Sequence, residues 1–351
     1  MVAAAPRTEP RSCCQQVVPA VIAHPHRPEP QDLEAAAAYS ARHRGLALLV
    51  LFEGETLLEH HAPDHPANQA LPIASGTKSL TGILAATAAA DGFLDLEEPV
   101  ARSLEEWRDD PRRSRITPRQ LLQLISGLEG GAKVGQVPSF EVALRTRAVA
   151  TPGERFFYGA APFQVLGEVL RRKLAALCPD PLDYLYGRVL DRIGMRVGRW
   201  RRGNDGWPDL SSGATLTARE WAKLGEWIRQ DGQWDGREMI PAGALQECFR
   251  GSQVNPAYGL GWWLNADLPA TARAHLQQAI LGVEDLAAES AVPRDLVYAA
   301  GAGKQRLYIS RQRGLVVVRQ AAGILEALAG GERSAFSDCE FWRRLSGTWR
   351  S

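Results

Sequence analysis

The strand-like segments of this chain lie at its two ends, and this separation constrains the fold more than any other feature. Near the start, the apolar run 45–52 (GLALLVLF), the turn pair Glu53-Gly54 and the segment 55–60 have the pattern of a β-hairpin. Further strand patterns are found at 258–264, 295–300, 306–310 and 315–320. One antiparallel sheet built from both ends, with helices packed on it, is the most economical arrangement.

Between these ends the patterns are mostly helical. Leu80, Ile83, Leu84 and Thr87 follow Ser75 at helical spacing, which predicts that Ser75 opens a helix. Further helices are predicted to start at Thr117, Pro162, Pro181 and Thr217, and another covers 338–345.

These patterns predict an α/β architecture of the α+β type. The antiparallel sheet comes from about 40–74 and about 251–351, and a mostly helical region of about 75–250 is inserted. The proline-rich residues 1–30 are predicted to be a flexible leader, and 31–351 to form the folded domain.

Charge and hydropathy exclude several partners. Lysine and arginine number 41 against 40 acidic residues. A chain with so little net charge has no long-range positive electrostatic field to attract nucleic acid. The longest uncharged apolar stretch, Ser79 to Ala90, has 12 residues. An integral membrane span needs about 20. No secretory signal is visible, so the cytoplasm is the default expectation, and the periplasm if the native start lies upstream. The oligomeric state is left open.

Two motif-like segments are rejected as ligand sites. Gly301 to Arg306 (GAGKQR) lacks the third glycine of a dinucleotide loop and leads into a strand rather than a helix. Prolines interrupt the histidine-rich segment 59–66, which predicts a solvated loop and no metal.

The five cysteines include no CxxC pair and favour neither zinc nor a disulfide framework. Cys13 and Cys14 lack a preceding lipoprotein signal, and their role is left open.

Ser75-Gly76-Thr77-Lys78 is the segment that best fits catalysis. The chain has only five lysines, and a lysine three residues after a serine on one helix lies beside its hydroxyl. A desolvated lysine can accept the proton of a weak serine nucleophile, and a helix N-terminus favours a developing oxyanion. The alternative to a catalytic role is that Ser75 only caps the helix and Lys78 lies on the surface.

Two further segments, in this order along the chain, strengthen the catalytic interpretation. A loop over 151–160 carries Tyr158, and a small-residue strand edge covers 298–302 (YAAGA). With the Ser-x-x-Lys segment, they make the chain resemble the serine β-lactamase and penicillin-binding-protein superfamily, in particular its class C-like branch of esterases, D,D-peptidases and nylon-oligomer hydrolases. The resemblance covers roughly 40–345 and implies a β-lactamase-like fold.

The resemblance also implies roles for individual residues. Ser75 is the expected nucleophile, Lys78 its proton-managing neighbour and Tyr158 a second general base or acid. The backbone N–H groups of Ser75 and Ala302 are the expected oxyanion hole, and Gly301 lines the pocket.

The pocket departs from the family pattern at three positions. Ala160 stands where the family usually has asparagine. Ala299 and Ala300 replace a Lys-Thr pair that anchors a carboxylate. These changes remove substrate anchors and leave the acyl-transfer residues in place.

The sequence therefore predicts a serine hydrolase that cleaves a small ester or amide through an acyl-Ser75 intermediate, without metal or organic cofactor. A β-lactamase or D-alanyl-D-alanine carboxypeptidase is the alternative, and Lys304 or an arginine in the pocket would favour it. A catalytically inactive binding protein of the same fold is the other alternative.

Overall fold

The computed structural model describes residues 27–129, 136–273, 283–329 and 334–348. Most of the predicted leader, including Cys13 and Cys14, lies outside these ranges. The first helix in the described part is α1 (Pro30–Arg42), with Pro30 in the first turn, where its missing N–H costs nothing. None of the helices within these ranges is long and apolar enough to cross a bilayer.

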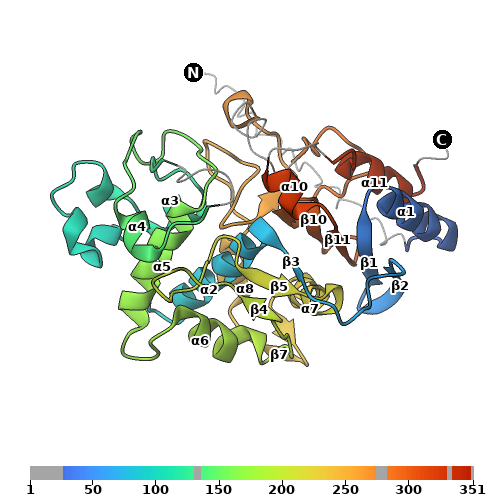
Figure 1. The fold of residues 1–351 in the computed structure, drawn as a ribbon, viewed down its shortest axis with the longest axis horizontal. Helices are drawn as coiled ribbons and strands as arrows, with labels where there is room; N and C mark the ends of the chain where they lie inside the picture. The colour runs from blue at the N-terminus through green and yellow to red at the C-terminus, as the bar shows by residue number, and fades with distance from the viewer. Residues whose placement is uncertain (1–26, 130–135, 274–282, 330–333, 349–351) are drawn as a thin grey trace, which may run out of the picture.

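The main sheet has six antiparallel strands in the order β2-β1-β11-β10-β9-β8 (Figure 1). Their bounds are β1 Gly45–Phe52, β2 Glu55–His61, β8 Trp263–Leu264, β9 Val297–Gly301, β10 Gln305–Ser310 and β11 Leu315–Ala321. β1 lies between its hairpin partner β2 and the last strand β11, with Leu49 opposite Val318. The prediction that the two ends of the chain build one antiparallel sheet is confirmed.

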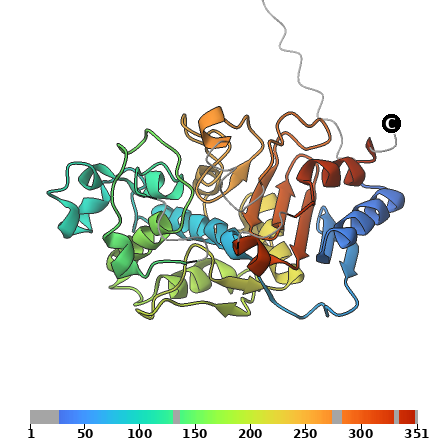
Figure 2. The same cartoon turned by 45° about the horizontal axis from the view of Figure 1, so that its top comes forward.

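Helices cover both faces of the main sheet (Figure 2). Tyr308 of β10 packs against Phe341 of α11 (Asp338–Leu345), with ring centroids 6.0 Å apart. Val316 of β11 points to the opposite face, where it meets α7 (Ala218–Arg229). A Cβ added at Gly225 of α7 would lie 2.5 Å from Val316 Cγ1, so this helix lies unusually close to the sheet.

The helix α2 (Thr77–Ala90) runs through the middle of the molecule and is buried along most of its length. The other α-helices that lie wholly within the described residues are α3 Pro118–Leu122, α4 Phe140–Leu144, α5 Ala161–Leu174, α6 Pro181–Leu185, α8 Ala242–Glu247 and α10 Ile324–Leu328. Shorter helical turns are η1 Ala74–Gly76, η2 Val100–Arg102, η3 Glu105–Trp107, η4 Arg113–Arg115 and the π-helical η5 Tyr186–Leu190.

Two small sheets lie mainly in the region predicted to be mostly helical, and only β3 precedes it. β3 (Leu71–Pro72), β5 (Ala214–Leu216) and β4 (Arg199–Trp200) form one of them. β6 (Gln233–Trp234) and β7 (Arg237–Glu238) form the other. These strands have two or three residues each, which is too short for an alternating pattern to show in the sequence.

The predicted strand at 258–264 is wrong except at its end, where β8 lies. Gly261 adopts a φ of +77°, and the backbone turns back so that Tyr258 bridges Trp263. A left-handed φ costs glycine little, which is why a tight turn forms inside an apolar run.

This glycine turn holds α2 in place. Ser79 Oγ donates a hydrogen bond of 2.7 Å to the carbonyl of Gly261. A Cβ added at Gly82 of α2 would lie 1.9 Å from the carbonyl oxygen of Leu260. The absence of a side chain at Gly82 therefore lets the turn contact the helix backbone one turn beyond Lys78.

Candidate active site

Ser75 lies in the short turn η1, directly ahead of α2. The α-helix thus begins two residues later than predicted, and Ser75 precedes its first turn. Ala74 has a φ of +47°, a left-handed backbone that is unfavourable for alanine. A Cβ added at Gly76 would lie 2.9 Å from the ring of Trp221, so glycine is needed there. Backbone strain and close packing thus fix the turn that presents Ser75.

Lys78 stands in the first turn of α2 with its side chain buried, while Ser75 is partly exposed. Lys78 Nζ donates hydrogen bonds to Ser75 Oγ at 3.2 Å and to the backbone oxygen of Ser211 at 3.1 Å. Burial lowers the pKa of Lys78 to about 8, and the negative charge of Asp209 opposes this shift. A hydroxyl of a partly exposed serine therefore lies beside an amine whose pKa is lowered toward neutral pH by burial.

Tyr158 lies in the loop before α5. Its ring stacks on Trp263 at 5.9 Å, meets Tyr258 edge-on at 6.2 Å and lies 5.0 Å from Lys78 Nζ. Burial raises the pKa of Tyr158, and a hydrogen bond with the Ser75 side chain partly offsets the shift. The structure therefore brings Ser75, Lys78 and Tyr158 into one cluster.

The end of β9 lies against the Ser75 turn. A Cβ added at Gly301 would lie 2.1 Å from the carbonyl oxygen of Ile73, so only glycine allows this approach. Ala300 and Ala302, on either side of Gly301, are both buried. The predicted oxyanion residues thus belong to neighbouring backbone segments, and the roles of the Ser75 and Ala302 N–H groups stay predictions.

Ala160, predicted to line the pocket, is the N-cap residue of α5 and is half-buried. It lies two residues after Tyr158 in the same loop. Its methyl group supplies neither a hydrogen-bond donor nor an acceptor to the side chains around Lys78.

Lys304, the residue whose presence in the pocket would have favoured a β-lactamase, is engaged elsewhere. Its Nζ lies 2.8 Å from Asp338 of α11 and 2.8 Å from Glu284. Arg306 contacts the same Asp338 carboxylate at 2.7 Å. These cations of the β9–β10 region are therefore held by carboxylates, one of them on the helix that covers the sheet.

Three residues that contact or influence Lys78 were not identified from the sequence. They are Ser211, through its carbonyl, Asp209, through its charge, and Phe163, whose ring centroid lies 5.4 Å from Lys78 Nζ. The pattern Asp-Leu-Ser-Ser is typical of a side-chain-capped turn, but it does not reveal that the turn faces α2.

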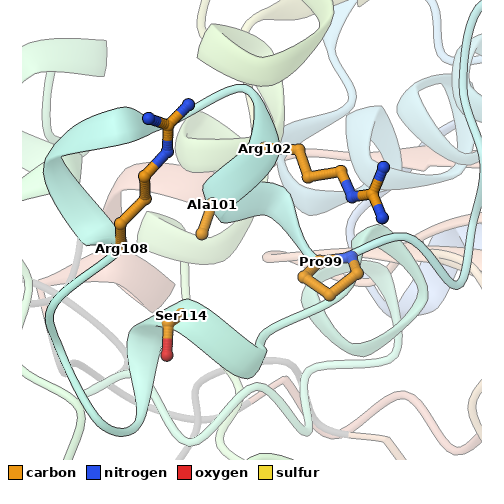
Figure 3. Close-up of a pocket in the computed structure, with 5 residues that line it drawn as sticks. All are labelled: Pro99, Ala101, Arg102, Arg108 and Ser114. Atoms are coloured by element: carbon orange, nitrogen blue, oxygen red, sulfur yellow. The ribbon is translucent and has the colours of Figure 1, made fainter.

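The cavity shown in Figure 3 is separate from this cluster. It has a volume of about 530 Å³ and is lined by Pro99, Ala101, Arg102, Arg108 and Ser114. The Arg102 and Arg108 side chains point in different directions rather than converging on the cavity (Figure 3). The cavity therefore lacks the convergent polar groups of a binding site.

Comparison with known proteins agrees with the fold. Residues 30–322 match the family described as Beta-lactamase. Similar solved structures include EstCE1, a hydrolase with promiscuous acyltransferase activity, with a TM-score of 0.67, 16% identity and coverage of 90% of this chain and 98% of that one. A penicillin-binding protein homologue from Caulobacter crescentus has a TM-score of 0.65 at 15% identity and covers 92% and 98%. A family VIII carboxylesterase has 0.63 at 14% identity, covering 93% and 98%.

No curated protein sequence matches this chain. The family match extends over most of the chain, so the protein belongs to the β-lactamase family of serine hydrolases. The predicted resemblance and the predicted β-lactamase-like fold are confirmed. At such low identities the solved structures define the fold of this chain and leave its substrate open.

Proposed function

We propose that this protein hydrolyses a small ester or amide through a covalent acyl-Ser75 intermediate. The observation that carries the proposal is the 3.2 Å contact between a partly exposed Ser75 hydroxyl and the buried amine of Lys78. A serine is a weak nucleophile until a neighbouring base accepts its proton, and a lysine with a pKa of about 8 can do so.

The reaction has two steps. Ser75 Oγ attacks the substrate carbonyl carbon, its proton passes to the Lys78 and Tyr158 pair, and the pair returns a proton to the leaving group as the acyl-enzyme forms. Water then attacks the acyl carbon with help from the same pair and regenerates Ser75. The N–H groups of Ser75 and Ala302 bind the oxyanion that develops in each step.

We expect fluorophosphonate labelling of the native protein at one serine, Ser75. The reagent phosphonylates an activated serine, and the Ser75 hydroxyl accepts a hydrogen bond from the desolvated Lys78. Peptide mass spectrometry should find the label on Ser75 and no label in Ser75→Ala. Substitution of the exposed Ser290 by alanine is the control and should leave labelling unchanged. Labelling of Ser75→Ala at a different serine, or no labelling of the native protein, would reject the proposal.

Neutral esters should be better substrates than β-lactams. Ala299 and Ala300 offer no charged or hydroxyl anchor for a carboxylate, and Lys304 is bound to two carboxylates. A charged anchor lost from a desolvated site costs about 2–5 kcal/mol, or roughly 30- to 4,000-fold in affinity. We therefore expect kcat/KM for p-nitrophenyl acetate to exceed that for nitrocefin. The reverse order, measured on one titrated enzyme preparation, would favour the β-lactamase alternative.

A further inference from the structure

The segment that joins β4 to β5 contains a buried carboxylate, that of Asp209. Asp209 is 2% exposed. Its Oδ1 accepts hydrogen bonds from Ser211 N at 2.9 Å, Ser211 Oγ at 2.8 Å and Ser212 N at 3.0 Å. Its Oδ2 accepts from Ser212 Oγ at 2.9 Å and from Arg201 Nη2 at 2.5 Å. The hydrogen bonds to this one carboxylate therefore stabilise the turn formed by residues 209–212.

The carbonyl of this turn is directed at the proposed catalytic lysine. Ser211 O accepts a hydrogen bond of 3.1 Å from Lys78 Nζ, and the only other acceptor recorded for Nζ within the described residues is Ser75 Oγ. Ala160 has no amide to hold the amine from the Tyr158 loop. The direction of the Lys78 side chain toward Ser75 thus depends on where the Ser211 carbonyl lies.

We propose that Asp209 is a positioning residue for the Lys78 amine, acting through the turn that aims the Ser211 carbonyl at it. The inference rests on the proposed acyl-Ser75 chemistry and adds to it a residue that contacts neither substrate nor nucleophile. Since the N–H groups of residues 211 and 212 both bind Oδ1, the plane of the peptide between them, which contains the Ser211 carbonyl, is fixed by the carboxylate.

The Asp209 charge acts on the same amine. The groups around Lys78 are Ser75, the rings of Tyr158 and Phe163 from α5 and its preceding loop, and the Asp209 turn with its Arg201 partner. Among them, the Asp209 charge favours the protonated amine and raises the pKa of Lys78 against the effect of burial. Loss of that charge lowers the pKa of Lys78 and moves the acid limb of the pH profile to lower pH.

Two variants separate the geometry from the charge. Asp209→Asn keeps an oxygen that can accept from the N–H groups of Ser211 and Ser212 but removes the charge. Asp209→Ala removes both. Asp205→Asn is the matched control, because Asp205 lies in the same segment and caps the backbone N–H of Phe140 instead.

The measurement is the pH profile of kcat/KM for p-nitrophenyl acetate, normalised to the fraction of Ser75 that a fluorophosphonate labels. We expect Asp209→Asn to shift the acid limb down by about half a unit or more. Asp209→Ala should lower kcat per labelled site by roughly 10- to 100-fold, as expected for a misplaced catalytic group. Asp205→Asn should retain the native profile.

The result distinguishes this inference from the proposed function. Native protein that is not labelled at Ser75 rejects the proposed function itself. Labelled protein whose acid limb is the same in Asp209→Asn and whose normalised kcat is the same in Asp209→Ala rejects the role of Asp209 alone. Loss of folded protein without a change in normalised kcat or profile shows a merely structural turn, and also overturns the inference.

Discussion

Replacing Tyr158 by phenylalanine, or Lys78 by alanine, should lower kcat/KM for p-nitrophenyl acetate by about 10²–10⁴-fold, the range for general acid–base catalysis. If the two side chains handle one proton together, the double variant should lose little more than either single variant. The structure places the Lys78 amine 5.0 Å from the Tyr158 ring, and both side chains interact with Ser75. Kinetics of the three variants, with a thermal melt on each, make the test.

Tyr258→Phe is the control for this experiment. Tyr258 is a fully buried tyrosine whose ring meets that of Tyr158, and its hydroxyl makes no hydrogen bond with the described residues. Removing that hydroxyl should leave kcat/KM within about twofold. A Tyr158→Phe variant that also stays within about twofold would show that Tyr158 serves packing, not chemistry.

The pH dependence of the native enzyme follows from the same pair. Lys78 accepts a proton only in its neutral form, and burial lowers its pKa to about 8. The value of kcat/KM should therefore rise with pH through this region. Because the two groups interact, the apparent pKa belongs to the pair and not to Lys78 alone. A profile that falls between about pH 6 and 8 would contradict the role of Lys78 as a base.

Replacing Asp338 by asparagine should lower the free energy of unfolding by about 3–5 kcal/mol, because it leaves buried cations without their counter-charge. The carboxylate lies 2.8 Å from Lys304 Nζ and 2.7 Å from Arg306 Nε, and the exposed fractions of the three side chains are 6% or less. The Tyr308 hydroxyl also donates a hydrogen bond to it. Equilibrium urea unfolding at neutral pH measures the difference.

Glu340→Gln on the same helix is the matched control. Glu340 pairs with Arg344 at 2.6 Å, but their side chains are 31% and 24% exposed. Loss of such a surface pair should change the free energy of unfolding by less than about 1 kcal/mol. Equal effects of the two substitutions would mean that the buried cluster around Asp338 contributes no more than a surface ion pair.

The acid dependence of this stability has a definite sign. Burial alone would raise the pKa of Asp338, but the charges of Arg306 and Lys304 hold it well below its usual range. Its contribution is therefore fully present above the unfolded-state pKa of about 4 and is lost as the pH falls toward the folded-state value. The stability difference between native protein and Asp338→Asn should be constant near neutral pH and shrink in acid.

The sequence predicted the elements whose pattern is long enough to be read locally. The apolar runs at 306–310 and 315–320 lie within β10 and β11, and the helix predicted at 338–345 is α11. The Ser75-x-x-Lys78 spacing also places the hydroxyl and the amine together, because three residues make almost one helical turn. Local periodicity fixes such features without tertiary information.

Tertiary contacts explain what the sequence did not predict. Ser211 reaches Lys78 through a backbone carbonyl, and a carbonyl has the same chemistry at every residue, so no residue type signals it. The glycines at 259 and 261 turn an apolar run back on itself, which hydrophobicity alone does not show. Lys304 could be identified as unusual by type, but its carboxylate partners come from distant segments.

The pairing of β1 with β11 sets an order of events for the nascent chain. β1 can form its hairpin with β2 as soon as both leave the ribosome, but its other edge stays bare until the last strand of the sheet has been made. A nascent chain that ends after α5 already contains Ser75, Lys78 and Tyr158, but it lacks the strands β9 to β11 that support them. The unpaired backbone edge of this apolar strand must therefore be shielded during synthesis. A chain released before β11 has been made would carry an unpaired, aggregation-prone strand.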